Sequence, residues 1–145
     1  MNSIITKELI VLDFEAASKE EVIKNLAKVI EAQDRLNDYD GYVEQVFDRE
    51  DNFPTALGFE FAIPHGKTNA VKNAAVAFAR LKNEVQWCED EKVKYVFLIA
   101  VPESGAGDTH LQILAQLSRK IMREEFRDKL KDSTDINELF ELLTA

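Results

Sequence analysis

A run of seven apolar residues, Tyr95–Val101 (YVFLIAV), constrains the fold of this chain more than any other feature of its sequence. Pro102 ends the run. A continuous apolar run without polar residues at alternate positions is typical of a strand that is covered on both faces. We therefore expect a central strand here, with other elements packed against both sides of its sheet.

Three other segments are predicted to be strands. Leu9–Asp13 (LIVLD) is a short run rich in β-branched residues, which favours a strand. Ala74–Leu81 (AAVAFARL) is ambiguous by propensity, but its short length between two asparagines favours a strand. Phe59–Ile63 (FEFAI) alternates bulky apolar residues with other residues, which indicates a half-buried strand that leads directly into His65.

Two helices are expected before these last strands. Ser18 and Glu21 form an S-x-x-E capping box, so the first helix is expected from Ser18 to about Ala32. The second helix is expected to end near Arg49 or Glu50. Its apolar face carries Tyr42, Val43, Val46 and Phe47.

The C-terminal part of the chain is predicted to be helical. After a loop that contains two glycines, Asp108 is a suitable N-cap for a helix. The apolar face of this helix is expected to carry Leu111, Leu114, Leu117 and Ile121. A short helix is expected around Glu124–Leu130, and a last one over about Asp135–Leu143, capped by Ser133 or Thr134.

This order of elements predicts the α/β class, as an α/β sandwich with one sheet. The 145 residues, of which 46% are hydrophobic, are enough to form one well-buried core. No internal repeat, low-complexity segment or linker divides the sequence. We therefore expect residues 1–145 to form a single domain.

The net charge of −9 is unevenly distributed. Nine acidic and two basic residues lie between Glu31 and Glu60, so this stretch carries −7 and the remaining residues −2. The phosphates of nucleic acids and of anionic membranes repel an acidic protein, which argues against a binder of either. The acidic stretch is interpreted either as solvated helix and loop faces or as a docking surface for a basic protein.

The sequence carries several indications of where the protein acts. Cys88 is the only cysteine, so no intrachain disulfide can form, which fits a reducing cytoplasm. The N-terminus lacks a basic segment followed by a sustained apolar run, so no signal peptide is expected. No stretch approaches the roughly 20 apolar residues of a membrane span. We expect a cytoplasmic protein.

The two histidines are the main candidates for chemistry. His65 is expected at the exit of a strand, where Pro64 stiffens the chain and Gly66 leaves one side of the imidazole open. His110 follows Asp108 by two residues, in the first turn of a helix, where free N–H groups suit an anion. A neutral imidazole is a nucleophile, and a second one can hydrogen-bond an attached anion. Either histidine alone is more often structural, but the pair at element ends favours a site.

Other polar residues carry weaker signals. For Arg49 the simpler interpretation is a salt bridge to a neighbouring acid, and the alternative is a guanidinium turned toward a phosphoryl group. Lys67 is interpreted as a solvated surface lysine. A zinc site built from His65, His110 and Cys88 would lack the usual ligand spacing, and no Walker or G-x-G-x-x-G motif supports a bound nucleotide. No metal and no cofactor are expected.

Two segments carry a family resemblance. The first is Arg49-Glu50 followed by Thr55–Lys67 (TALGFEFAIPHGK), and the second is Val96–Pro102 followed by His110–Arg119 (HLQILAQLSR). They resemble the enzyme IIA component of the bacterial sugar phosphotransferase system, of the fructose and mannitol type (EIIA type 2). The resemblance extends from the first helix to the last, and it implies a mixed sheet with helices on both faces.

The resemblance also implies a role for three residues. His65 matches the histidine that takes a phosphoryl group from the phosphohistidine of the carrier protein HPr. That histidine passes the group to a cysteine of a IIB domain, which phosphorylates the sugar during its uptake through a membrane IIC domain. His110 matches a second histidine that supports the phosphoryl group and orients the site, and Arg49 matches an arginine near it.

The sequence departs from the family pattern without losing a reacting group. Ala56 stands where the family usually has glycine, and Phe59 and Phe61 are bulkier than the residues often found there. Two functions fit the resemblance. One is a phosphoryl carrier in sugar uptake, which the apolar strand and the LAQLSR helix favour, with a fructose-type sugar. The other is a nitrogen-related regulatory module whose phosphorylation state at His65 controls binding to another protein.

Overall fold

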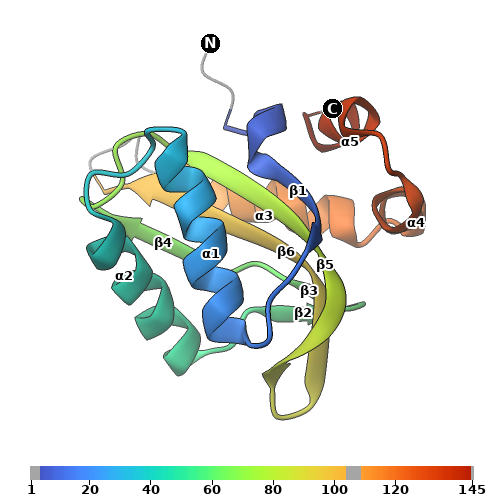
Figure 1. Ribbon diagram of the computed structural model, residues 1–145, viewed down its shortest axis with the longest axis horizontal. Coiled ribbons are helices and arrows are strands. Elements are labelled where there is room, and N and C mark those ends of the chain that lie inside the picture. Colours follow the sequence, from blue (N-terminus) through green and yellow to red (C-terminus); the bar gives the residue numbers. More distant parts are fainter. Residues whose placement is uncertain (1–3, 104–108, 145) are drawn as a thin grey trace.

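The computed structural model describes residues 4–103 and 109–144, except for the side chains of residues 109 and 110. In this part of the chain a six-stranded mixed sheet lies between helices on both faces (Figure 1). The strands are β1 (Ile10–Phe14), β2 (Ala56–Gly58), β3 (Phe61–Ala62), β4 (His65–Thr68), β5 (Ala75–Cys88) and β6 (Glu91–Pro102). The helices are η1 (Lys7–Leu9, a 3-10 turn), α1 (Lys19–Ala32), α2 (Tyr39–Asn52), α3 (Thr109–Ile121), α4 (Glu124–Asp132) and α5 (Ile136–Thr144). The predicted α/β sandwich is confirmed.

Strand β6 contains the apolar run and lies inside the sheet, as predicted. The strand order is β1-β5-β6-β3-β2, and β4 also pairs with β6. Strand β5 pairs with β6 in the antiparallel direction, whereas β3 and β4 pair with it in the parallel direction. Every residue of Tyr95–Val101 is buried. Strand β4, which begins with His65, is therefore positioned by its pairing with this central strand.

The two faces of β6 belong to two separate apolar cores, which explains why the run has no polar alternation. Val96, Leu98 and Ala100 pack into the core beneath α1 and α2. The alternate residues pack into the core beneath α3, α4 and α5, and they are Tyr95, Phe97, Ile99 and Val101. Successive side chains of a strand point to opposite faces, so a strand with helices on both sides must be apolar at every position.

The first two helices begin at capping side chains. The Oγ of Ser18 accepts a hydrogen bond from the N–H of Glu21 at 3.2 Å, as predicted. The Glu21 carboxylate accepts from the N–H of Ala17, at 3.4 Å, rather than from that of Ser18. Helix α2 is capped by Asp38, whose Oδ1 accepts from the N–H of Gly41 at 3.1 Å. It continues to Asn52, a short way beyond the predicted end.

The prediction of a single strand over Phe59–Ile63 is right only for Phe61–Ala62, which forms β3. Strands β2 and β3 form an antiparallel hairpin, and its tip holds Gly58, Phe59 and Glu60 at φ values of 89°, 57° and 72°. The ring of Phe59 lies beneath the guanidinium of Arg127 on α4, with 3.9 Å from Cζ to the ring centroid. The left-handed conformation of a phenylalanine is held here by contacts to distant residues, so alternation in the local sequence did not reveal it.

Two predictions about the C-terminal helices also need correction. On α3 Leu111 is 65% exposed, and Ile113 takes the buried position instead. Helix α5 is capped by Asp135 rather than by Ser133 or Thr134, because the Oδ1 of Asp135 accepts from the N–H of Asn137 at 2.9 Å. The predicted cap Asp108 lies outside the described residues. None of the described helices combines the length and the apolar character that a membrane crossing requires.

Candidate functional site

His65 is the first residue of β4, so it begins a strand rather than following one as predicted. Its side chain is buried, and its Nδ1 lies 2.9 Å from the carbonyl oxygen of Ile63. A carbonyl oxygen can only accept, so Nδ1 is the donor of this bond. In the neutral ring the lone pair is then on Nε2. The backbone of β4 thus fixes both the orientation and the tautomer of the imidazole.

The strand of His65 is held between β6 and α2. The backbone N–H of Ile99 donates to the carbonyl of Pro64 at 3.0 Å, and the buried hydroxyl of Tyr42 donates to the carbonyl of Ile99 at 2.8 Å. A Cβ added to Gly66 would lie 3.2 Å from a ring carbon of Tyr42 and from a methyl group of Val46. Gly66 therefore allows α2 to pack closely on β4, which differs from its predicted role of opening one side of the imidazole.

The protonation of His65 is set by four influences. Burial has the largest effect and lowers the pKa of the imidazole below its ordinary value, because it penalises the cation. The hydrogen bond to Ile63 raises this pKa, the positive charge of Arg49 lowers it, and the negative charge of Glu50 raises it. The net effect is a lowered pKa, so the ring is neutral and nucleophilic at neutral pH.

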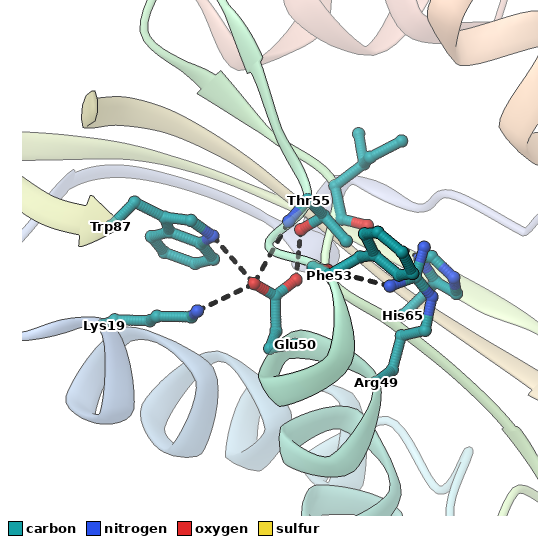
Figure 2. Close-up of polar contacts among 8 residues, drawn as sticks. Lys19, Arg49, Glu50, Phe53, Thr55, His65 and Trp87 are labelled. Carbon is teal, nitrogen blue, oxygen red and sulfur yellow. Dashed lines mark hydrogen bonds and ion pairs between the residues drawn. The ribbon is translucent and has the colours of Figure 1, made fainter. Parts of the chain in front are cut away.

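Arg49 lies in the last turn of α2, close enough to His65 for its charge to act on the imidazole. Its Nη1 donates to the carbonyl oxygen of Phe53 at 2.8 Å, instead of pairing with Asp48 or another neighbouring acid. Figure 2 shows the guanidinium beside the His65 ring. The structure thus brings together two of the three predicted site residues, and it places a positive charge next to a buried imidazole.

The third predicted residue, His110, has its backbone in the first turn of α3. Its side chain lies outside the described residues. Lys67 is exposed, as expected. Cys88 ends β5 in the β5–β6 hairpin, where it is half-buried. Within residues 4–103 and 111–144, no group of three or more histidine, cysteine, aspartate or glutamate side chains is arranged to hold a metal ion.

The sequence interpretation missed the role of Glu50. Its side chain is buried, so Glu50 does not belong to the solvated faces or to the docking surface expected from the acidic stretch. The carboxylate meets donors from Lys19, Thr55 and Trp87 (Figure 2). A signal was present in the sequence, because Glu50 follows the apolar residues Val43 and Val46 by seven and four positions. This spacing places its carboxylate on the apolar face of α2.

Comparison with known proteins identifies the family. Over residues 3–145 the chain matches the family described as "Phosphoenolpyruvate-dependent sugar phosphotransferase system, EIIA 2". It is 36% identical to the fructose-specific EIIABC component of Bacillus subtilis, over 99% of this chain and 23% of that protein. It is 38% identical to the fructose-specific EIIA component of Haloferax volcanii, over 92% of this chain and 87% of that protein. The chain spans about a fifth of the length of several longer relatives.

Two solved structures share the fold. The nitrogen regulatory protein IIA-Ntr from Neisseria meningitidis has a TM-score of 0.87 at 30% identity, covering 97% of this chain and 96% of that chain. A chain of the complex of IIA and phosphorylated IIB for mannitol from Escherichia coli has a TM-score of 0.81 at 28% identity, covering 94% of both chains. The resemblance seen in the two sequence motifs is confirmed. This chain belongs to the EIIA type 2 family of the phosphoenolpyruvate-dependent sugar phosphotransferase system.

Proposed function

We propose that this protein is a phosphoryl carrier that holds the transferred group on His65. The observation that carries this proposal is the hydrogen bond from Nδ1 of His65 to the Ile63 carbonyl, because it directs the lone pair of a neutral ring to Nε2. The lowered pKa of His65 and the charge of Arg49 beside it add support. Components of this family are phosphotransferases with a phosphohistidine intermediate.

The proposed reaction is an in-line exchange between two nitrogen atoms. Nε2 of His65 attacks the phosphorus of a phosphohistidine on the donor, a new N–P bond forms, and the N–P bond of the donor breaks. Arg49 stabilises the negative charge on the phosphoryl oxygens. Nδ1 of His65 keeps its proton and donates it in the hydrogen bond to the Ile63 carbonyl, so the ring leaves as a neutral imidazole when the acceptor attacks in turn. His110 supports the phosphoryl group from the first turn of α3.

The proposed partners follow from the family. HPr is the phosphoryl donor, a cysteine of a IIB domain is the acceptor, and a membrane IIC component is served indirectly. The structure of a IIA–IIB complex among the relatives supports the IIB partner, and two fructose-specific relatives support a fructose-type sugar. We place the reaction in the cytoplasm, in a single domain of residues 1–145, without metal, cofactor or nucleic acid.

A second function is supported by a specific observation. The nitrogen regulatory protein IIA-Ntr has a TM-score of 0.87 to this chain. In this alternative the phosphoryl group on His65 does not pass to a sugar but controls binding to another protein. The site chemistry of the first step is the same, so the two functions differ only in the acceptor.

A transfer assay with purified components separates these functions. The protein is incubated with phosphorylated HPr and then with purified IIB candidates, and phosphoryl transfer to the IIB cysteine is followed by intact mass. Sugar transport predicts complete transfer to a IIB of the fructose type. Acceptance from HPr without transfer to any IIB would favour the regulatory alternative. No acceptance by the wild-type protein would contradict both.

A further inference from the structure

Glu50 stands at the centre of a buried polar cluster that connects the residues of the candidate site. We propose that Glu50 is a positioning residue that holds His65 and Arg49 in the geometry for phosphoryl transfer, acting through Thr55. This inference rests on the proposed function of His65, and it adds a residue that does not itself touch the phosphoryl group. Figure 2 shows the contacts of Glu50 with Lys19, Thr55 and Trp87.

The carboxylate of Glu50 is bound from three directions. Its Oε1 accepts from the N–H of Thr55 at 3.2 Å and from Nε1 of Trp87 at 3.0 Å, and it pairs with Nζ of Lys19 at 2.9 Å. Its Oε2 accepts from the hydroxyl of Thr55. These donors come from the start of α1, from β5 and from the segment that follows α2. Glu50 therefore ties the end of α2 to both neighbouring elements.

A continuous series of hydrogen bonds leads from Glu50 to the imidazole. Thr55 is bound to Glu50 through both its N–H and its hydroxyl, and its carbonyl accepts from the N–H of Ile63 at 3.2 Å. The carbonyl of Ile63 in turn accepts from Nδ1 of His65 at 2.9 Å. The position of the carbonyl that orients the ring thus depends on Thr55, and the position of Thr55 depends on Glu50.

The same carboxylate restrains the segment that holds Arg49. Arg49 precedes Glu50 in α2, and its Nη1 donates to the carbonyl of Phe53 at 2.8 Å. The backbone N–H of Phe53 donates back to the carbonyl of Arg49 at 3.2 Å. The hydrogen bonds between Glu50 and Thr55 join the two ends of the four-residue segment between them. This restrains the segment and thereby the position of the Phe53 carbonyl. The guanidinium is therefore oriented by a loop whose two ends meet at Glu50.

The cluster requires a carboxylate rather than an amide. All the groups that meet Glu50 are donors, and one of them is the ammonium of Lys19, which also lies 5.3 Å from the ring centroid of Trp87. A glutamine of the same shape would turn an NH₂ group toward donors and would leave the lysine charge without its partner. Glu50→Gln therefore keeps the volume of the side chain but disturbs the connection to Thr55.

The effect on the reaction is expected in the chemical step. Transfer requires alignment of Nε2, phosphorus and the leaving nitrogen, and small displacements of a reacting group are costly. Glu50 is buried, so its replacement leaves the surface that meets the donor unchanged. We expect Glu50→Gln to lower kcat for transfer from phosphorylated HPr by between about tenfold and a hundredfold. The KM for the donor should stay close to that of the wild type.

The test combines kinetics with a double-mutant cycle and a matched control. Glu124→Gln makes the same chemical change at an exposed position of α4, and it should leave kcat unchanged. Because Glu50 also orients Arg49, Glu50→Gln should lower kcat by a smaller factor in an Arg49→Met background than in the wild type. A kcat for Glu50→Gln equal to that of Glu124→Gln, or a cost undiminished by Arg49→Met, would overturn the proposal.

A spectroscopic measurement separates this inference from the proposed function. In the wild-type protein the Nδ1 proton of His65 should give a protected, low-field NMR signal, which Glu50→Gln should shift or broaden while Glu124→Gln does not. An unchanged signal would overturn the positioning role, whatever the reaction. If the wild type accepts no phosphoryl group, only the proposed function fails. If Glu50→Gln does not fold, Trp87→Phe, which removes one donor to Oε1, takes its place with the same two outcomes.

Discussion

At the scale of single residues, the groups around the His65 ring determine its pKa and its orientation. Burial and the charge of Arg49 lower its pKa, whereas the Ile63 carbonyl and the charge of Glu50 raise it. The two groups that raise the pKa belong to the hydrogen-bonded series that orients the ring. The net lowering keeps the ring neutral. The site thus combines a neutral nucleophile with a cationic neighbour, which suits a phosphoryl acceptor.

The lowered pKa of His65 makes a prediction for the pH dependence of transfer. In the proposed reaction the nucleophile is the neutral ring, so phosphoryl acceptance should persist as the pH falls through about 6.5, the ordinary pKa of histidine, and should be lost only below it. The unfolded chain binds a proton at His65 at higher pH than the folded protein does. This residue therefore lowers the free energy of unfolding as the pH falls through the same range.

Two measurements check this prediction. A pH profile of acceptance from phosphorylated HPr gives the acid limb, and an NMR titration of the imidazole C–H signals gives the pKa of His65 directly. Both should lie below 6.5. A midpoint at or above the ordinary value would contradict the prediction and would show that the Ile63 hydrogen bond and the charge of Glu50 outweigh burial.

The sequence predicted part of this site and missed another part for a physical reason. His65 and Arg49 stand out because their residue types suit a phosphoryl group and because they lie in a family motif. Glu50 was assigned to the acidic stretch because a charged residue is normally exposed. Its burial depends on Trp87, which is 37 positions away and meets it only in the folded protein. A pattern in the local sequence does not show such a partner.

At the scale of elements, the long regular segments were predictable and the short irregular ones were not. The apolar residues of α1 recur at helical spacing, and the run in β6 is apolar at every position from Tyr95 to Val101. The alternation of Phe59–Ile63 predicted a strand where the tip of the β2–β3 hairpin forms. This tip is held by Arg127 and by the N–H groups of Lys94 and Tyr95, which donate to the Glu60 carbonyl. Tertiary contacts there override the local pattern.

A prediction at this scale concerns the end of α4. Nη1 of Arg80, a buried residue of β5, donates to the carbonyls of Leu130 at 2.9 Å and Ser133 at 2.6 Å. Arg80→Met would leave these carbonyls without a donor, and we expect it to lower the free energy of unfolding by about 2 kcal/mol. Urea denaturation followed by circular dichroism measures the change.

The neighbouring Lys82 provides the control for Arg80. It lies on the same strand, is exposed, and meets Glu15 at 3.7 Å. Lys82→Met should change the free energy of unfolding by less than about 0.5 kcal/mol. Equal denaturation midpoints for the Arg80 and Lys82 variants would show that the bonds to the end of α4 contribute nothing.

At the scale of the whole molecule, part of the negative charge of the acidic stretch lies on one exposed face of α2. Asp40, Glu44 and Asp48 are exposed and follow one another at intervals of four residues along α2, the helix that also carries Arg49. Glu50 does not belong to this surface, because it is buried. Both interpretations of the acidic stretch stay open, and a docking surface for a basic carrier would lie on this exposed face of α2.

The acidic face of α2 predicts a salt-dependent encounter with the donor. At low ionic strength the double change Glu44→Gln and Asp48→Asn should raise the KM for phosphorylated HPr several-fold and leave kcat unchanged, because the two residues attract the donor without touching the reacting atoms. Added salt should remove the difference from the wild type. Steady-state kinetics at two salt concentrations provides the test, and an identical KM at low salt would assign these acids to solvation alone.

Peptide mapping identifies the residue that accepts the phosphoryl group, which we propose to be His65. The protein is incubated with phosphorylated HPr, digested under conditions that preserve phosphohistidine, and analysed by mass spectrometry alongside His65→Ala and His110→Ala. We expect the peptide containing His65 to carry one phosphoryl group, His65→Ala to accept none, and His110→Ala to accept it more slowly. A phosphoryl group on another residue, or acceptance by His65→Ala at the wild-type rate, would contradict this proposal.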